Sequence, residues 1–199
     1  MSQTLSQPSS RPFLTFVGLW FVAACVAGLT GRVAAMTPPL PQVIIGAMTL
    51  ALILSGALHP GLRAWLTQVN LRGFVAFHLT RYVGIAFLVL YERGQMSGEF
   101  AVTAGWGDIV AATGALAIVL FLRDPMSKPS LLALWNALGL ADILLVVITA
   151  TRIALHSPEG VQALLVFPMS LVPTFMVPLV IASHVLVLWR LRRLRVKRA

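Results

Sequence analysis

The sequence contains little charge, few acidic residues and a single cysteine. Only 11% of its 199 residues are charged and 58% are hydrophobic, whereas soluble domains carry roughly 25% charged residues on average. A soluble fold of this size has no core large enough to hide so much apolar surface, so the excess requires lipid as its solvent. The composition therefore excludes an ordinary soluble domain and predicts a membrane protein.

The shortage of reactive groups excludes several kinds of chemistry. A lone cysteine, Cys25, cannot form an intrachain disulfide, and no Cys/His cluster has the spacing of a zinc site. We interpret Cys25 as a small buried hydrophobic residue, because it lies inside an apolar run. The sequence also has no nucleotide-binding glycine loop, no HExxH and no Gly-x-Ser-x-Gly. These absences favour a protein that is not an enzyme.

The net charge of +9 does not indicate a nucleic-acid partner. Six of the fifteen basic residues lie in the last ten positions and the others are scattered, without the basic, aromatic-interleaved face of a nucleic-acid binder. We interpret the charge as a signal of membrane topology. The basic tail after Trp189 is also expected to contact anionic lipid headgroups.

Six apolar stretches are each close to the roughly 20 residues that cross a ~30 Å hydrocarbon layer. Helices are the expected spanning form, because a helix satisfies its own backbone groups. The sequence therefore predicts an all-α polytopic transmembrane bundle over 13–189, between a short cytoplasmic segment, 1–12, and a basic cytoplasmic tail, 190–199. The predicted spans are Phe13–Met36, Pro41–Leu58, Gly73–Tyr91, Ala101–Leu122, Leu131–Arg152 and Phe167–Trp189.

Three local features refine this topology. The first stretch continues for about twenty residues, longer than the ~7–15 of a signal-peptide core, which favours an uncleaved span. The segment Gly61–Arg72 is expected to form a short interfacial helix, with Trp65 and Leu66 on its apolar side. Pro168, Pro173 and Pro178 recur every five residues, so the last span should be bent or locally opened.

The distribution of Lys and Arg predicts that both termini lie in the cytoplasm. The opposite side would then hold only Arg32, Arg93 and Arg152. The cytoplasmic side would hold eleven basic residues, namely Arg11, Arg63, Arg72, Arg123, Lys128, Arg190, Arg192, Arg193, Arg195, Lys197 and Arg198.

A few polar side chains lie within the predicted spans, where they are costly and mark functional sites by default. A rise of ~1.5 Å per residue places Arg81, Asp108 and Asp142 about 10–16 Å deep, near the middle of the membrane. His78, Asn136 and His184 would form a second layer about 8 Å below the cytoplasmic surface. His78, Arg81 and Tyr82 are expected on one helical face, at spacings of three and four residues.

Two interpretations of the deeper layer remain open. Arg81 can form a buried ion pair with Asp142 or Asp108 that fixes helix register, and breaking such a pair costs about 3–5 kcal/mol. Alternatively, the layer is a proton-coupled or anion-binding site, because two carboxylates for one arginine leave a surplus carboxylate able to carry a proton. Small residues around Asp108, from Gly105 to Gly114, predict a central position for this span.

The histidine layer also has two interpretations. His78 and His184 can form ordinary hydrogen bonds between helices. They can also hold one cofactor, a haem or a metal ion, between two helices at equal depth.

Three segments carry a resemblance to a known group. They are Arg81-Tyr82-Val83-Gly84, Phe100 to Asp108 (FAVTAGWGD), and Trp135 to Asp142 (WNALGLAD). Together with the prolines of the last span, these segments resemble small uncharacterised bacterial six-helix inner-membrane proteins. The resemblance covers about half of the chain and implies a six-helix bacterial membrane protein, but it implies no activity.

These observations leave three function classes. The first is a small transporter, or a transporter subunit, with a site at Arg81, Asp108 and Asp142. The second is a redox or cofactor-binding membrane protein that uses His78 and His184. The third is a structural or assembly subunit with no site. The expected location is the bacterial cytoplasmic membrane, and a homo-oligomer is expected because six short helices make a small transporter.

Overall fold

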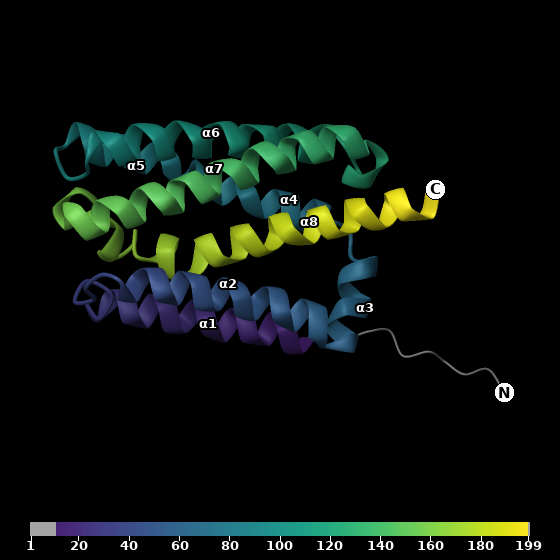
Figure 1. Cartoon of the computed structure of the whole chain (residues 1–199), viewed down its shortest axis with the longest axis horizontal. Helices are drawn as coiled ribbons and strands as arrows, with labels where there is room; N and C mark the ends of the chain where they lie inside the picture. The colour runs from purple at the N-terminus through teal and green to yellow at the C-terminus, as the bar shows by residue number, and fades with distance from the viewer. Residues whose placement is uncertain (1–10, 199) are drawn as a thin grey trace.

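The computed structural model describes residues 11–198, and within this range every regular element is helical (Figure 1). Six helical segments in it are long and apolar enough to cross a membrane. The predicted all-α bundle with six spans is therefore confirmed. Most of the predicted N-terminal segment lies outside the described residues. The spans are Arg11–Leu29, Leu40–Leu58, Arg72–Glu92, Gly98–Phe121, Pro129–His156 and Val172–Leu194.

The helices form two groups with the last helix between them (Figure 1). Helices α1 (Arg11–Leu29) and α2 (Leu40–Leu58) form a hairpin on one side. The other side contains α5 (Gly84–Glu92), α6 (Gly98–Phe121) and α7 (Pro129–His156). Helix α8 (Val177–Arg198) packs against both α2 and α7 and joins the two groups.

Two of the six spans are not uniform α-helices. The third consists of α4 (Arg72–Phe77), the 3-10 segment η1 (His78–Val83) and α5. The last begins with the π-helical segment η4 (Val172–Met176), which contains Pro173, and continues as α8. A proline inside a helix lacks the N–H that its turn needs, so the predicted local opening of this span is confirmed.

Several span boundaries in the structure differ from those predicted from the sequence. The first span ends at Leu29 instead of Met36, and the chain turns at Gly31, whose φ of 72° favours glycine. The last span begins at Val172 instead of Phe167, because the 3-10 segment η3 (Pro158–Leu165) and a turn precede it. Helix α8 also continues through most of the predicted tail, as far as Arg198.

The short helix predicted over Gly61–Arg72 forms as α3 (Pro60–Gln68), and Arg72 instead begins α4. His59 caps its start, because the imidazole Nδ1 accepts a hydrogen bond from the Leu62 N–H at 3.2 Å, and Pro60 occupies a first-turn position where no N–H is needed. Trp65 packs against Phe13 and Phe74. This contact ties α3 to the first and third spans at one end of the bundle, called here the α3 end.

The core consists of two apolar clusters with a polar layer between them. The first cluster surrounds Phe87 and Phe100 and extends toward the opposite end, where η3 lies. The second surrounds Val75 and Leu132 and extends toward the α3 end. Along four spans the buried polar side chains fall between the two clusters. They are His78, Arg81, Asp108, Asn136, Ser183 and His184.

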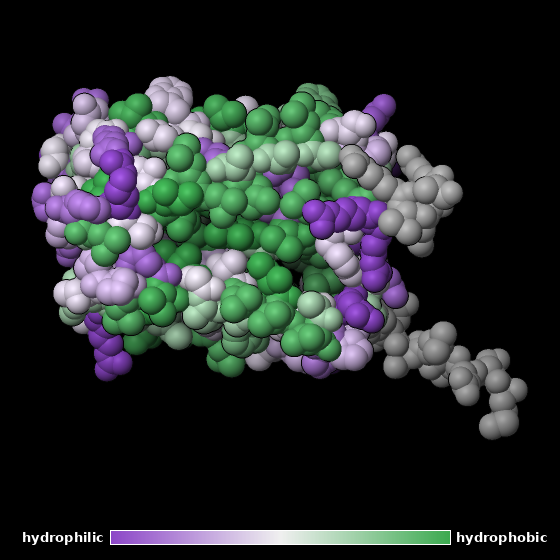
Figure 2. Space-filling view, viewed as in Figure 1, coloured by the Kyte–Doolittle hydropathy of each residue, from purple (hydrophilic) through white to green (hydrophobic). Residues whose placement is uncertain are grey.

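The outer surface of the bundle is apolar across its middle. Figure 2 shows a broad hydrophobic band that runs across the molecule between hydrophilic side chains at the two ends. The large exposed side chains in this band include Leu19, Val110 and Leu138. Such a band is what a lipid-facing surface requires, and it agrees with the six spans.

The close approach of α5 to α6 gives the first prediction. A Cβ at Gly84 would lie 2.9 Å from the Asp108 Cβ and would also collide with the Gly105 carbonyl oxygen. Gly84→Ala is therefore expected to lower the free energy of unfolding by about 1–3 kcal/mol, measured by denaturant unfolding in detergent micelles.

Gly46→Ala is the matched control, because no atom lies within 4 Å of its added Cβ. It is expected to be neutral or stabilising by up to about 1 kcal/mol, since alanine favours helix more than glycine does. Equal stability of the two variants would contradict the close packing of α5 on α6.

Candidate functional site

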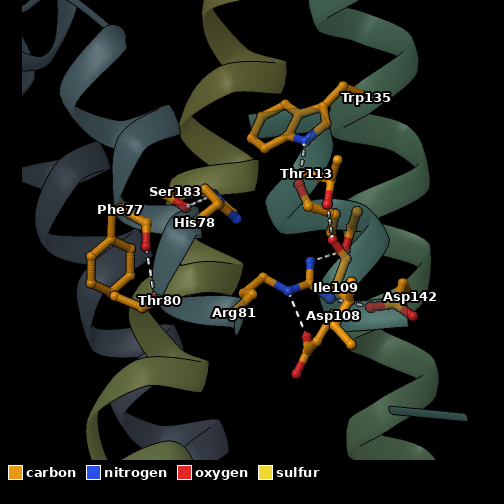
Figure 3. Close-up of polar contacts among 12 residues, drawn as sticks. Phe77, His78, Thr80, Arg81, Asp108, Ile109, Thr113, Trp135, Asp142 and Ser183 are labelled. Atoms are coloured by element: carbon orange, nitrogen blue, oxygen red, sulfur yellow. Dashed lines mark hydrogen bonds and ion pairs between the residues drawn. The ribbon is translucent and has the colours of Figure 1, made fainter. Parts of the chain in front are cut away.

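Arg81 is the centre of the polar layer. Its side chain is 2% exposed and extends from η1 toward α6 and α7 (Figure 3). The Nε donates to Asp108 Oδ1 at 2.6 Å, Nη2 donates to Asp142 Oδ2, and Nη1 donates to the Gly139 carbonyl at 3.1 Å. All three guanidinium nitrogens are therefore satisfied, by groups on two helices. We call Arg81, Asp108 and Asp142 the charged triad.

Glycines make the space for this triad. A Cβ at Gly107 would collide with the Asp142 carboxylate, and a Cβ at Gly139 would lie 3.5 Å from Arg81 Nη1 and 2.8 Å from His184 Cε1. The small residues predicted to bring helix backbones together thus also admit polar side chains between α6 and α7. Trp135 donates its Nε1–H to the Ala111 carbonyl at 3.0 Å and fixes the same pair of helices one turn further along.

The charged triad contains one more carboxylate than cation. Both aspartates contact the same guanidinium, but the side chain of Asp108 is 5% exposed and that of Asp142 is 20% exposed. With all three groups ionised the triad carries a charge of −1 between two apolar clusters, which is costly at membrane depth. A proton or a bound cation at the more accessible Asp142 would remove this excess.

The two histidines form a packed pair beside the charged triad. His78 and His184 are almost fully buried, and their ring centroids are 4.4 Å apart. Trp135 covers both rings, at 4.9 and 5.4 Å. His184 and Arg81 border the same space beside Gly139, since an added Cβ there would contact both side chains. The two layers expected from the sequence are thus adjacent.

The hydrogen bonds of this pair define its tautomers. The Ser183 hydroxyl donates to the Val180 carbonyl, so the neutral His78 ring donates from Nε2 to Ser183 Oγ at 2.9 Å. His184 donates from Nδ1 to Asn136 Oδ1 at 2.9 Å. The remaining nitrogens, His78 Nδ1 and His184 Nε2, are therefore acceptors, and both are buried without a hydrogen-bond partner. Two neighbouring imidazoles thus each have one nitrogen without a hydrogen-bond partner.

This geometry does not fit haem ligation. An iron lies about 2 Å from each ligating nitrogen, so two imidazoles that bind one haem have centres about 6 Å apart with the porphyrin between them. At 4.4 Å the two rings instead contact each other directly. Within residues 11–198, no group of three or more His, Cys, Asp or Glu side chains is arranged to hold a metal ion.

One predicted neighbour lies elsewhere. Tyr82 was expected on the face of His78 and Arg81, but its hydroxyl contacts Thr113 Oγ1 at 3.2 Å on the exposed side of α6. The segment η1 has three residues per turn, so positions i and i+3 align while i+4 rotates away. Ser183 was not predicted to join His78 in the polar layer, because a serine in an apolar helix commonly bonds only its own backbone.

Two cavities lie at opposite ends of the bundle, and the second contacts the polar layer at Ser183. One of about 330 Å³ lies at the η3 end, and its walls include Gln42, Thr151 and Pro173. The other, of about 230 Å³, lies at the α3 end, and its walls include Phe175 and Ser183. Segment η4 contributes to both, and Ser183 connects the second cavity to His78.

A family model described as "Domain of unknown function (DUF8737)" matches residues 38–192. The chain belongs to this family. The DUF8737 match extends from just before α2 into α8 and includes the charged triad and both histidines. No curated protein and no solved structure matches the chain.

The ion contacts give the second prediction. Arg81→Gln is expected to lower the free energy of unfolding by about 3–5 kcal/mol, because it leaves the buried Asp108 and the partly buried Asp142 without a cation. Adding Asp142→Asn to this variant should recover part of the loss, because one uncompensated charge is removed. Denaturant unfolding of the purified single and double variants measures both effects.

Arg152→Gln is the control for this prediction. It breaks the Arg152–Glu99 pair, whose side chains are 56% and 54% exposed, so its cost is expected to stay within about 1 kcal/mol. A similar small cost for Arg81→Gln would show that the charged triad does not hold the helices together.

The contact between the imidazoles gives the third prediction. The detergent-purified protein, prepared from haem-replete cells, is expected to show no Soret band before or after reduction with dithionite. His78→Ala should lower stability without the loss of any chromophore. A Soret band that disappears in His78→Ala or His184→Ala would contradict the packed geometry.

Proposed function

We propose that this protein is a small proton-coupled transporter, or the membrane subunit of one, in a bacterial cytoplasmic membrane with both termini in the cytoplasm. The proposal rests on the charged triad, in which a buried and a partly buried carboxylate contact one arginine between apolar clusters. An inert bundle has no need of this surplus charge.

The charge excess suggests how the triad would operate. Protonation of Asp142 leaves a neutral Arg81–Asp108 pair, whereas its ionisation leaves a net charge of −1. Asp142 is the better proton carrier, because its side chain is more exposed than that of Asp108. Since Arg81 is on η1, Asp108 on α6 and Asp142 on α7, each change of charge alters the contacts among three spans.

The histidine pair lies between the cavity at the α3 end and the charged triad. His78 and His184 each have a buried nitrogen without a hydrogen-bond partner, and His184 and Arg81 both border the space beside Gly139. Ser183 is hydrogen-bonded to His78 and lines the cavity at the α3 end. This end is the predicted cytoplasmic side, since it contains most of the basic residues.

Segment η4 supports movement of the last span. It is a π-helical segment with a proline, and its residues line two cavities that lie at opposite ends of the bundle. Broken helices next to polar groups at mid-membrane are typical of secondary transporters. Bending at η4 would therefore expose the polar layer to one end at a time.

The other function classes have less support. An ion pair that only fixes helix register needs one carboxylate for Arg81, so a purely structural role leaves Asp142 unexplained. The redox class needs a cofactor between the two imidazoles, and their rings are in direct contact. Assembly into a dimer is compatible with the transporter and is part of the proposal.

The fourth prediction tests the proton coupling. In inverted membrane vesicles energised by respiration, addition of a transported compound should partly dissipate the pH gradient. The dissipation is measured as recovery of the quenched fluorescence of a pH-sensitive dye. A panel of amino acids, organic anions and lipophilic cations covers the main substrate classes. Asp142→Asn is expected to abolish the recovery while the variant stays folded.

Glu99→Gln is the matched control, because it removes an exposed carboxylate from an ion pair at the surface, and it should retain the signal. A fluorescence recovery in Asp142→Asn equal to that of the wild type would contradict the proposal. The proposal would also be contradicted if the folded wild-type protein gave no fluorescence recovery with any compound of the panel.

A further inference from the structure

An apolar groove with a basic mouth lies between α2, α3 and α8, away from the charged triad. Its volume is about 260 Å³. Figure 2 shows a hollow in this part of the surface, where the apolar band ends among hydrophilic side chains. The walls are Leu52, Ile53, Gly56, Ala57, Leu66, Ala182, Val185 and Leu186, and Arg63, Trp189 and Arg193 complete the lining.

The two arginines at the groove are free to bind an anion. Both are exposed, and neither forms an ion pair with a carboxylate in the described part of the chain. Arg193 lies over the Trp189 ring, with its guanidinium carbon 4.2 Å from the ring centroid. Stacking of this kind orients the planar donors of an arginine without satisfying them.

A third arginine holds the groove together. Arg190 Nη1 donates to the Leu66 carbonyl at 2.8 Å and to the Val69 carbonyl at 3.1 Å. These bonds join the end of α3 to α8. Arg63 on α3 and Arg193 on α8 are therefore held on either side of one opening.

We propose that this groove binds one phospholipid with an anionic headgroup. An acyl chain lies along the apolar wall of α2 and α8, and the headgroup phosphate accepts hydrogen bonds from Arg63 and Arg193. The apolar wall and the two arginines would bind different parts of this ligand. Free phosphate has no apolar chain to pack against the wall, and a neutral lipid leaves both guanidinium groups without a charged acceptor.

The position of the groove agrees with this occupant. It lies at the α3 end, the predicted cytoplasmic side, where anionic lipids are concentrated in the adjoining leaflet, and Trp189 occupies the level at which tryptophans anchor spans. The groove also differs from the basic tail, which is expected to attract anionic surfaces without a pocket. A bound lipid would join the α1–α2 hairpin to α8.

The fifth prediction tests headgroup selection. Native mass spectrometry of the full chain in detergent, with phosphatidylglycerol or phosphatidylcholine added, should show tighter binding of phosphatidylglycerol. Arg63→Gln with Arg193→Gln is expected to weaken this binding by at least about tenfold, the effect of losing charge-assisted hydrogen bonds. Arg123→Gln with Arg192→Gln removes the same charge outside the groove and should change binding less than about threefold.

The acyl chain is tested separately. Ala182→Leu fills the groove and should weaken phosphatidylglycerol binding with both arginines present. Short-chain phosphatidylglycerol and inorganic phosphate should compete poorly. In the otherwise unaltered protein, phosphatidylglycerol with brominated chains should quench tryptophan fluorescence more than brominated phosphatidylcholine, and Trp189→Phe should remove the difference.

Three results would overturn the proposal. The first is equal binding of phosphatidylglycerol and phosphatidylcholine. The second is an equal loss in the two double-arginine variants, which would indicate general charge attraction. The third is full competition by inorganic phosphate, which would indicate an anion site without an acyl chain. None of these results depends on the transport activity.

Discussion

The guanidinium of Arg81 sets the constraint on which the rest of the bundle depends. A cation buried between apolar clusters must have its donors satisfied within the protein, because lipid offers no acceptor. Asp108, Asp142 and the Gly139 carbonyl supply the three acceptors. To reach them, η1, α6 and α7 must approach closely, and the glycines at 84, 107 and 139 permit this approach. One polar requirement thus fixes the arrangement of three spans.

The constraint also explains where the fold departs from regular helix. Segment η1 has three residues per turn, which aligns His78 with Arg81 and lets both point into the bundle. Segment η4 interrupts the last span and contributes residues to the walls of both cavities. Irregular backbone at membrane depth is tolerated where it is buried in protein or lines a cavity. Both interruptions meet that condition.

Two features of the polar layer distinguish it from polar contacts that only hold helices together. The charged triad has a surplus carboxylate, and the histidine pair has two acceptor nitrogens without donors. A layer selected only for stability would pair these groups, since an unsatisfied buried polar group costs about 1–3 kcal/mol. Their persistence is the physical basis of the proposed proton coupling. The lipid groove at the α3 end is independent of this layer and borders α8, whose first turn follows η4.

The sequence by itself determined the number of spans, the all-α class and five of the six polar residues buried between the clusters, all except Ser183. Apolar runs and charged groups are local properties, and the cost of charge in lipid does not depend on the arrangement of the helices. Tertiary structure alone decided that Arg81 contacts both aspartates, that the two imidazoles touch, and that Tyr82 turns away. These outcomes depend on lateral helix packing and on the 3-10 pitch of η1, because neither spacing nor composition encodes which faces of distant helices meet.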